Sequence, residues 1–368
     1  MTGPADASAD GLLSRCVRAG LFPGACAAWS GPPPAPITIV CRGVARITGM
    51  HDLAVAPDTV WDLASLTKPL VVTTLALLMR RSGLWTFDDP LRAVLPVAEG
   101  SAVGERSLRS LLAHTAGLPA WRPVYALAHG RRDRALRAVL DIPLSGGQDE
   151  RVEYSCLGFL LLGWALEHTA GTPLDELFRR RVTRPLGLEA ELGFMPRTLH
   201  AGELAGEALS PRVECELTVR WGSDPATVPP CAPGLPDDGN ARFLGGVAGN
   251  AGLFGTARAA LRLAGEYLPG GGTLLTDDEA ALAARRATHG ADGQHRALGW
   301  QLASTPGSSA GSALDPSAFG HTGFTGTSIW VDPVRRLVAG LFAHRHHPAH
   351  RGVDLQPIRR RFHALVTA

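Results

Sequence analysis

Lysine is almost missing from this sequence of 368 residues: the 36 basic residues include only one lysine, Lys68, and the rest are arginine. Arginine stays protonated in proteins, whereas a buried lysine can lose its proton and act as a base. A preference for arginine codons explains the excess of arginine but not the position of the one exception. We therefore expect Lys68 to perform chemistry that arginine cannot.

An excess of charge of either sign is missing as well, because 36 Lys and Arg balance 34 Asp and Glu and leave a net charge of +2. This balance predicts no nucleic-acid partner and no attraction to anionic membranes. No run of about 18 apolar residues is free of charge, so we expect no membrane span. Residues 1–10 are polar and acidic and do not resemble a signal peptide, which favours a cytoplasmic location.

Cysteines at C-x-x-C spacing, typical of metal and redox sites, are also missing. We expect the six cysteines to be reduced structural thiols, which again favours the cytoplasm. Four histidines that follow a predicted strand have no cysteine or carboxylate at ligand spacing, so we expect a solvated loop there and no metal or cofactor. These residues are Cys16, Cys26, Cys41, Cys156, Cys215 and Cys231, and His344, His346, His347 and His350.

What is present is the composition of a globular protein, with 45% hydrophobic and 19% charged residues. Helix and strand patterns alternate over about residues 11–70 and again over 245–368. Between them, at about 71–244, lie helical patterns and loops. We predict a single domain over residues 1–368, of the α/β (α+β) class, with an all-α and loop insert.

Ser65 and Lys68 stand at the start of a long apolar helix predicted to run to about Arg81. Residues at i and i+3 share one face of a helix, about 5–6 Å apart. Free N–H groups at the helix start stabilise negative charge, and a desolvated lysine can take the proton of a serine nucleophile. The alternative is an ordinary helix-capping serine with a surface lysine.

Two further elements carry candidate chemistry. Tyr154, one of only three tyrosines, precedes an apolar helix, and a phenol near an ammonium group has a lowered pKa and can relay protons. The alternative is a half-buried packing tyrosine. The run His321-Thr322-Gly323 leads into a strand, where its backbone allows close approach of a substrate and stabilises an oxyanion. The alternative is a turn with a surface histidine.

In this order and spacing, the three elements resemble those of the serine β-lactamase and penicillin-binding protein superfamily, most of all its class C-like members and related esterases. The resemblance covers roughly residues 20–365. It implies a β-lactamase/transpeptidase-like fold, in which helices flank a mainly antiparallel sheet and an all-α subdomain borders the cleft. The flanking motifs that strengthen it are Trp61–Ala64, Leu111–Pro119, Gly245–Phe254 and Phe319–Gly323.

The resemblance also implies roles for the residues. Ser65 would be the acylated nucleophile and Lys68 the base that activates it. Tyr154 would pass a proton to the leaving group and later activate the deacylating water, and His321 stands where many members have the lysine of a Lys-Thr-Gly triad. The backbone N–H groups of Ser65 and Phe324 would form the oxyanion hole. Thr322, Gly323, Phe324 and Cys156 would contact the substrate.

Two departures from the family pattern favour one activity over others. Cys156 replaces the asparagine of Tyr-x-Asn, and His321 is mostly neutral at pH 7, which weakens recognition of a carboxylate. Both favour an esterase-like serine hydrolase that acts on a small ester, amide or peptide. The alternatives are β-lactamase or D-Ala-D-Ala peptidase-like activity, and a catalytically silent binding or regulatory module of the same fold.

Four other features have structural rather than catalytic interpretations. The run Gly307–Gly311 matches G-x-S-x-G, but no helix is predicted after it, so we expect a loop rather than a nucleophile. The glycines over residues 245–255 indicate close backbone packing. His114 is expected to bond backbone groups in its own turn, and Asp237-Asp238-Gly239-Asn240 to form a turn or line the cleft.

Overall fold

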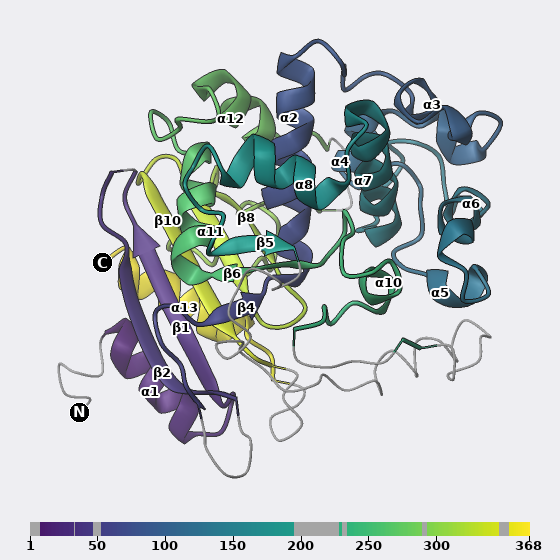
Figure 1. Cartoon of the computed structure of the whole chain (residues 1–368). Helices are drawn as coiled ribbons and strands as arrows, with labels where there is room; N and C mark the ends of the chain where they lie inside the picture. Colours follow the sequence, from purple (N-terminus) through teal and green to yellow (C-terminus); the bar gives the residue numbers. More distant parts are fainter. Residues whose placement is uncertain are drawn as a thin grey trace.

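The computed structural model describes residues 8–32, 34–46, 53–194, 228–229, 234–288, 293–345 and 353–368. Helices surround an antiparallel sheet built from both ends of this chain (Figure 1). The sheet confirms the predicted fold class. Its strands, from one edge to the other, are β3 (Leu53–Ala54), β2 (Thr38–Arg46), β1 (Gly24–Ser30), β10 (Leu337–Ala343), β9 (Ser328–Asp332), β8 (Phe319–Thr322) and β7 (Gln301–Leu302).

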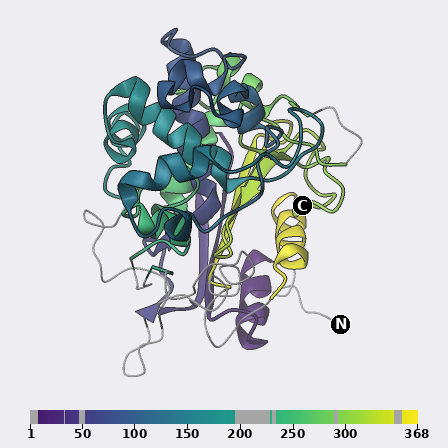
Figure 2. The ribbon, with the colours of Figure 1, turned by 90° about the vertical axis from the view of Figure 1, so that its right-hand side faces the viewer.

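Alternation along the central strands separates two cores. In β1, Ala25 and Ala27 face a core shared with α1 (Ala9–Arg18) and α13 (Gln356–Val366), whereas Cys26 and Ala28 face the larger core on the other side. This is the period of two that a strand imposes on its side chains. Figure 2 shows α1 and α13 beside one face of the sheet and the remaining helices beyond the other.

A second, three-stranded sheet has the order β4 (Val60–Asp62), β6 (Leu253–Thr256) and β5 (Leu192–Phe194). β5 lies within the segment 71–244 that was expected to contain only helices and loops. Three residues carry too little periodicity to be detected as a strand, which explains the miss. The pairing of β4 with β6 places the residues that follow Asp62 beside those that precede Leu253.

The helix expected to begin at Ser65 is not a regular α-helix. Residues Ala64–Leu66 form a 3₁₀ turn, Lys68–Thr73 form a wider π-type turn, and only α2 (Thr74–Arg81) is α-helical. An apolar pattern does not distinguish these three helix types, and Pro69 has no N–H to donate to a regular ladder. Ser65 lies in the 3₁₀ turn and Lys68 begins the π-type turn, and the two side chains still meet, with Lys68 Nζ 3.0 Å from Ser65 Oγ.

The other helices form the remainder of the large core, and α7 (Cys156–Ala170) has nine buried residues. Ser155 caps its start and Gly171, with φ +59, ends it. These helices are α3 (Leu91–Val94), α4 (Leu108–Leu112), α5 (Val124–Leu127), α6 (Ala135–Leu140), α7 (Cys156–Ala170), α8 (Leu174–Phe178), α10 (Gly239–Phe243), α11 (Ala257–Ala264) and α12 (Asp277–Ala284). Within the described ranges, no helix has the length and apolar character needed to cross a membrane.

Some residues singled out in the sequence are not described by the structure. Cys215, Cys231, His346, His347 and His350 lie outside the described residues. The described cysteines Cys16, Cys26, Cys41 and Cys156 are free thiols.

Candidate active site

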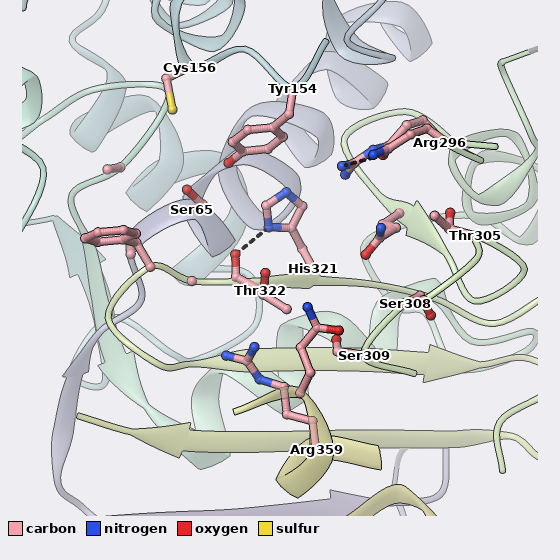
Figure 3. A pocket seen from close by; sticks show the side chains of 18 of the residues that line it. Ser65, Tyr154, Cys156, Arg296, Thr305, Ser308, Ser309, His321, Thr322 and Arg359 are labelled. Carbon is pink, nitrogen blue, oxygen red and sulfur yellow. Dashed lines mark hydrogen bonds between the residues drawn. The ribbon is translucent and has the colours of Figure 1, made fainter. Parts of the chain in front are cut away.

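A cavity of about 1010 Å³ gathers most of the predicted site residues (Figure 3). It is bordered by the 3₁₀ turn after β4, the start of α7 and the end of β8. Seven of the eight predicted residues line it: Ser65, Tyr154, Cys156, His321, Thr322, Gly323 and Phe324. The eighth, Lys68, is completely buried behind Ser65.

Ser65 follows a strained residue. Ala64 has φ +47, a left-handed conformation that is costly for a residue with a side chain. Asp62 stabilises it, because one carboxylate oxygen accepts the Ala64 N–H at 2.8 Å and the other accepts the Asp237 N–H at 2.7 Å. Burial raises the pKa of Asp62 to about 6, although these two N–H groups oppose the shift. Asp62 thus fixes the turn that presents Ser65 to the cavity.

Lys68 contacts Ser65 directly. Its Nζ donates to Ser65 Oγ at 3.0 Å and to the Asn250 carbonyl at 2.9 Å, and lies 5.0 Å from the centre of the Tyr154 ring. Burial lowers the pKa of Lys68, but Cys156 and Tyr154 outweigh this effect and the pKa lies above its ordinary value. The resting lysine is therefore an ammonium group, so burial alone does not make it the free base that the sequence led us to expect.

Tyr154 lies between several charged and aromatic groups. Its ring packs against His114 at 4.6 Å and against His321 at 5.7 Å, measured between ring centres. Burial raises the pKa of Tyr154, while Lys68 and a hydrogen bond to Ser65 oppose the rise. The phenol is therefore protonated at neutral pH, and the pKa is not lowered as we expected from the nearby ammonium alone.

His114 helps to place Tyr154. Its Nδ1 accepts the backbone N–H of Ser155 at 3.0 Å, rather than a group of its own turn as we expected. The contact fixes the residue next to Tyr154, and the two rings pack at an interplanar angle of 44°. Burial, followed by the charges of Arg296 and Lys68, lowers the pKa of His114 well below its ordinary value, so this ring is neutral.

His321 is also neutral, as predicted. Its Nδ1 lies 2.9 Å from the Thr322 carbonyl, which can only accept, so Nδ1 carries the hydrogen and Nε2 is bare. Burial, aided by the charges of Lys68 and Arg296, lowers the pKa of His321 well below its ordinary value. The buried Nε2 has no hydrogen-bond partner among the residues that the structure describes, so it can accept a proton from a group entering the cavity.

The turn after β8 is tied to the residues before Ser65. Thr325 Oγ1 donates to the Asp62 carbonyl at 2.9 Å, and Thr327 Oγ1 lies 3.3 Å from the Leu63 carbonyl. A Cβ on Gly323 would lie 2.1 Å from Thr327 Oγ1 and 2.9 Å from the Leu63 oxygen. Only glycine lets this turn approach Ser65 so closely, which brings the backbone of Phe324 to the cavity wall.

Asn250 is a site residue that the sequence analysis missed. Its carbonyl holds Lys68, and its side-chain amide is buried, with no hydrogen-bond partner at either polar atom within the described part of the chain. Burial raises the pKa of the Cys156 thiol, and Lys68 and the nearby Asn250 amide oppose this rise. Asn250 therefore places a side-chain amide near position 156, where Cys156 replaces the asparagine of the Tyr-x-Asn pattern. A buried asparagine in a glycine-rich run is the signal that could have identified it.

The glycines around Asn250 pack closely, as predicted: a Cβ on Gly249 would lie 2.0 Å from the Phe159 carbonyl. The G-x-S-x-G match also lies in turns with no helix after it, and Ser309 accepts the indole N–H of Trp330 at 3.3 Å. Asp237 and Asp238 line the cavity, and Asp238 also caps α10. No cluster of metal-ligating side chains occurs among the described residues.

Comparisons with known proteins give the family and the fold. The sequence model of the Beta-lactamase family matches residues 38–362. A protein of Escherichia coli K12 named "Putative D-alanyl-D-alanine carboxypeptidase" is 27% identical over 317 residues, which cover 78% of this chain and 70% of that protein. The fold is similar to that of "EstCE1, a hydrolase with promiscuous acyltransferase activity", with a TM-score of 0.75, 21% identity, and coverage of 96% of this chain and 97% of that one. A penicillin-binding protein homologue from Caulobacter crescentus gives a TM-score of 0.74 at 18% identity and covers 100% and 99%.

Proposed function

The chain belongs to the Beta-lactamase family of hydrolases, and from that premise we propose that it is a serine hydrolase that cleaves an ester or amide through an acyl-enzyme on Ser65. One observation carries the proposal: a completely buried amine, the only lysine of the sequence, lies 3.0 Å from the Ser65 hydroxyl. A serine becomes a strong nucleophile only when such a base takes its proton.

The first half of the reaction acylates Ser65. The reactive form is the one in which the Lys68–Tyr154 pair has lost a proton, and Lys68 then accepts the hydrogen of Ser65 Oγ as this oxygen attacks the substrate carbonyl. The backbone N–H groups of Ser65 and Phe324 stabilise the oxyanion, and each lowers the barrier by about 2.7–4 kcal/mol. The proton then passes through Tyr154 to the leaving group, whose bond to the acyl carbon breaks.

The second half hydrolyses the acyl-enzyme. A water molecule attacks the acyl carbon as its proton passes through the Tyr154 phenol to Lys68. Lys68 returns a proton to Ser65 Oγ as the bond between Ser65 and the acyl carbon breaks, which restores the starting state. The bare Nε2 of His321 can accept a hydrogen bond from this water. The neutral state of His321 supports an acceptor role at this position rather than the cationic role of a Lys-Thr-Gly lysine. This chemistry favours esterase-like turnover over β-lactam hydrolysis.

Covalent labelling tests the proposal. A fluorophosphonate should add one adduct to the full chain, detected by intact mass and placed on Ser65 by peptide mapping, and Ser65→Ala should not react. Ser82→Ala is the matched control because Ser82 is exposed and lies outside the cavity. Equal labelling of Ser65→Ala would refute the nucleophile.

The rates of turnover of different substrates distinguish an esterase from a β-lactamase. Hydrolysis of p-nitrophenyl esters of graded chain length without hydrolysis of nitrocefin is the expected result. Faster turnover of nitrocefin would reverse the preference for esters. Labelling without turnover of any ester, amide or β-lactam would favour the catalytically silent module.

A further inference from the structure

Two cysteines of the large sheet lie directly opposite each other on the neighbouring strands β1 and β2 (Figure 1). The register of the two strands pairs Cys26 with Cys41. At the end of this ladder, the Val44 N–H donates to the Pro23 carbonyl at 3.0 Å. Hydrogen-bonded and non-hydrogen-bonded pairs alternate along an antiparallel ladder, and the cysteines are three pairs further on. They therefore form a non-hydrogen-bonded pair, the kind in which opposite side chains lie closest.

This position meets the main geometric requirement of a disulfide. The Cα atoms of a non-hydrogen-bonded pair are about 4.5 Å apart, and the Cα atoms of bridged cysteines are about 4.4–6.8 Å apart. Both side chains are on the same face of the sheet, because Cys26 belongs to the large core and Cys41 packs against that core. Both cysteines are free thiols. The structure therefore contains the reduced form of a pair that can be bridged without moving the strands.

The two thiols differ in exposure and acidity. Cys26 is completely buried, whereas Cys41 is partly exposed. The Cys26 thiol, aided by Arg42, lowers the pKa of Cys41 against the opposing effects of burial and Asp58. The Cys41 thiol, followed by burial, raises the pKa of Cys26 well above its ordinary value. Because the thiolate is the reactive form of cysteine, Cys41 is the thiol that an oxidant meets first.

The other described cysteines are not placed to compete for this pairing. Cys16 lies in the core on the opposite face of the sheet, where α1 packs. Cys156 lines the cavity at the start of α7. Within the described part of the chain, Cys26 is thus the partner that the strand register gives to Cys41.

We propose that Cys26 and Cys41 are a site of oxidative modification, at which a peroxide converts the two thiols into a disulfide that joins β1 to β2. The sulfur of Cys41 attacks the peroxide, the O–O bond breaks, and a sulfenic acid forms as one molecule of water leaves when the oxidant is hydrogen peroxide. The sulfur of Cys26 then attacks the sulfur of Cys41, and a second molecule of water leaves as the S–S bond forms. The peroxide gains two electrons, and the two thiols lose two electrons and two protons.

The bond would strengthen a weakly held part of the sheet. On its other side, β2 pairs only with the two-residue strand β3. A disulfide between positions 26 and 41 closes a ring of about 16 residues and restricts the unfolded chain. Neither cysteine lines the cavity, so this proposal holds or fails independently of the nucleophile at Ser65.

The test treats the full wild-type chain with hydrogen peroxide, then denatures it and labels the remaining thiols with N-ethylmaleimide. Peptide mapping should show a linked pair of peptides that contain Cys26 and Cys41, and the loss of the maleimide label at both positions. Dithiothreitol should restore both labels. The Tm of the oxidised chain should be about 4 °C higher than that of the reduced chain.

Variants test the order of the two steps. Cys26→Ala should stop at the sulfenic acid of Cys41, which dimedone traps, and Cys41→Ala should give no dimedone adduct at Cys26. Cys16→Ala is the matched control, because it removes a buried thiol outside the pair and should keep the linked peptides.

The measurement on the wild-type chain decides the proposal even if a variant does not fold. Retention of both maleimide labels after peroxide treatment would overturn the proposal. So would oxidation of Cys41 to a sulfinic acid without linked peptides, or a linkage of Cys41 to a cysteine other than Cys26. A dimedone adduct on Cys26 in Cys41→Ala, with none on Cys41 in Cys26→Ala, would refute Cys41 as the thiol that reacts first.

Discussion

Replacing Lys68 by methionine separates the catalytic effect of this residue from its effect on stability. Methionine keeps most of the volume of the side chain but removes the charge and the base. If Lys68 removes the proton of Ser65, the rate of fluorophosphonate labelling should fall by about 100- to 10,000-fold, the usual contribution of a general base. Lys68→Arg should label no faster, because arginine does not lose its proton.

The stability of the same variant follows from the contacts of Lys68. Replacing a buried ion pair by apolar residues of similar volume stabilises some proteins by about 1–4 kcal/mol, and we apply the same range to the single charge of Lys68. Leaving the Asn250 carbonyl without its donor costs about 1–3 kcal/mol. The free energy of unfolding should therefore change by between about −2 and +3 kcal/mol. With an unfolding entropy of about 2.1 cal/mol/K per residue, 1 kcal/mol shifts the Tm of a chain this long by roughly 1.3 °C.

Two measurements on the same preparation of Lys68→Met separate the catalytic role of Lys68 from its role in stability. They are the labelling rate, followed by intact mass, and the Tm, measured by calorimetry. We expect a large loss of labelling with a Tm within about 4 °C of the wild-type value. A fall in Tm larger than that would mean that Lys68 mainly stabilises the fold. Labelling within tenfold of the wild-type rate would mean that another group activates Ser65.

Two more predictions concern the same site. The labelling rate should rise with pH through neutrality, about tenfold per unit, because the base form of the Lys68–Tyr154 pair appears only above its raised pKa; a rate already constant at pH 7 would favour His321, whose pKa is lowered. Gly323→Ala should reduce kcat/KM at least tenfold, because its Cβ would meet Thr327 Oγ1 and the Leu63 oxygen and displace the turn that carries the oxyanion donor. Gly193→Ala, where a Cβ meets nothing within 4 Å, is the matched control.

The part of the site that the sequence predicted is the part encoded locally. Ser65 and Lys68 are three residues apart, and any tight helical turn brings them together. Tyr154 and His321 stand next to the start of α7 and at the end of β8, and such element ends commonly face a cleft in this fold. Local patterns also predicted that helices and strands alternate over about residues 11–70 and 245–368.

The part that could not be predicted depends on contacts between distant segments. The carbonyl that holds Lys68 belongs to Asn250, which is 182 residues away along the chain. Arg296 belongs to no motif, and nothing in its neighbours indicates that its guanidinium is buried beside Tyr154. The protonation state of Lys68 was missed for the same reason, since it is set by these groups and not by the residues next to it.

The electrostatics of the cavity fit a reaction that creates negative charge. Lys68, Arg296 and Arg359 are buried cations, burial aided by the charges of Lys68 and Arg296 keeps His114 and His321 neutral, and burial keeps Tyr154 protonated. Among the described residues that line the cavity, the acids Asp237 and Asp238 supply the only formal negative charge. An oxyanion on the substrate would reduce the repulsion among these cations. The free chain therefore holds an unfavourable charge distribution that the transition state relieves, and binding that improves as charge develops is what lowers a reaction barrier.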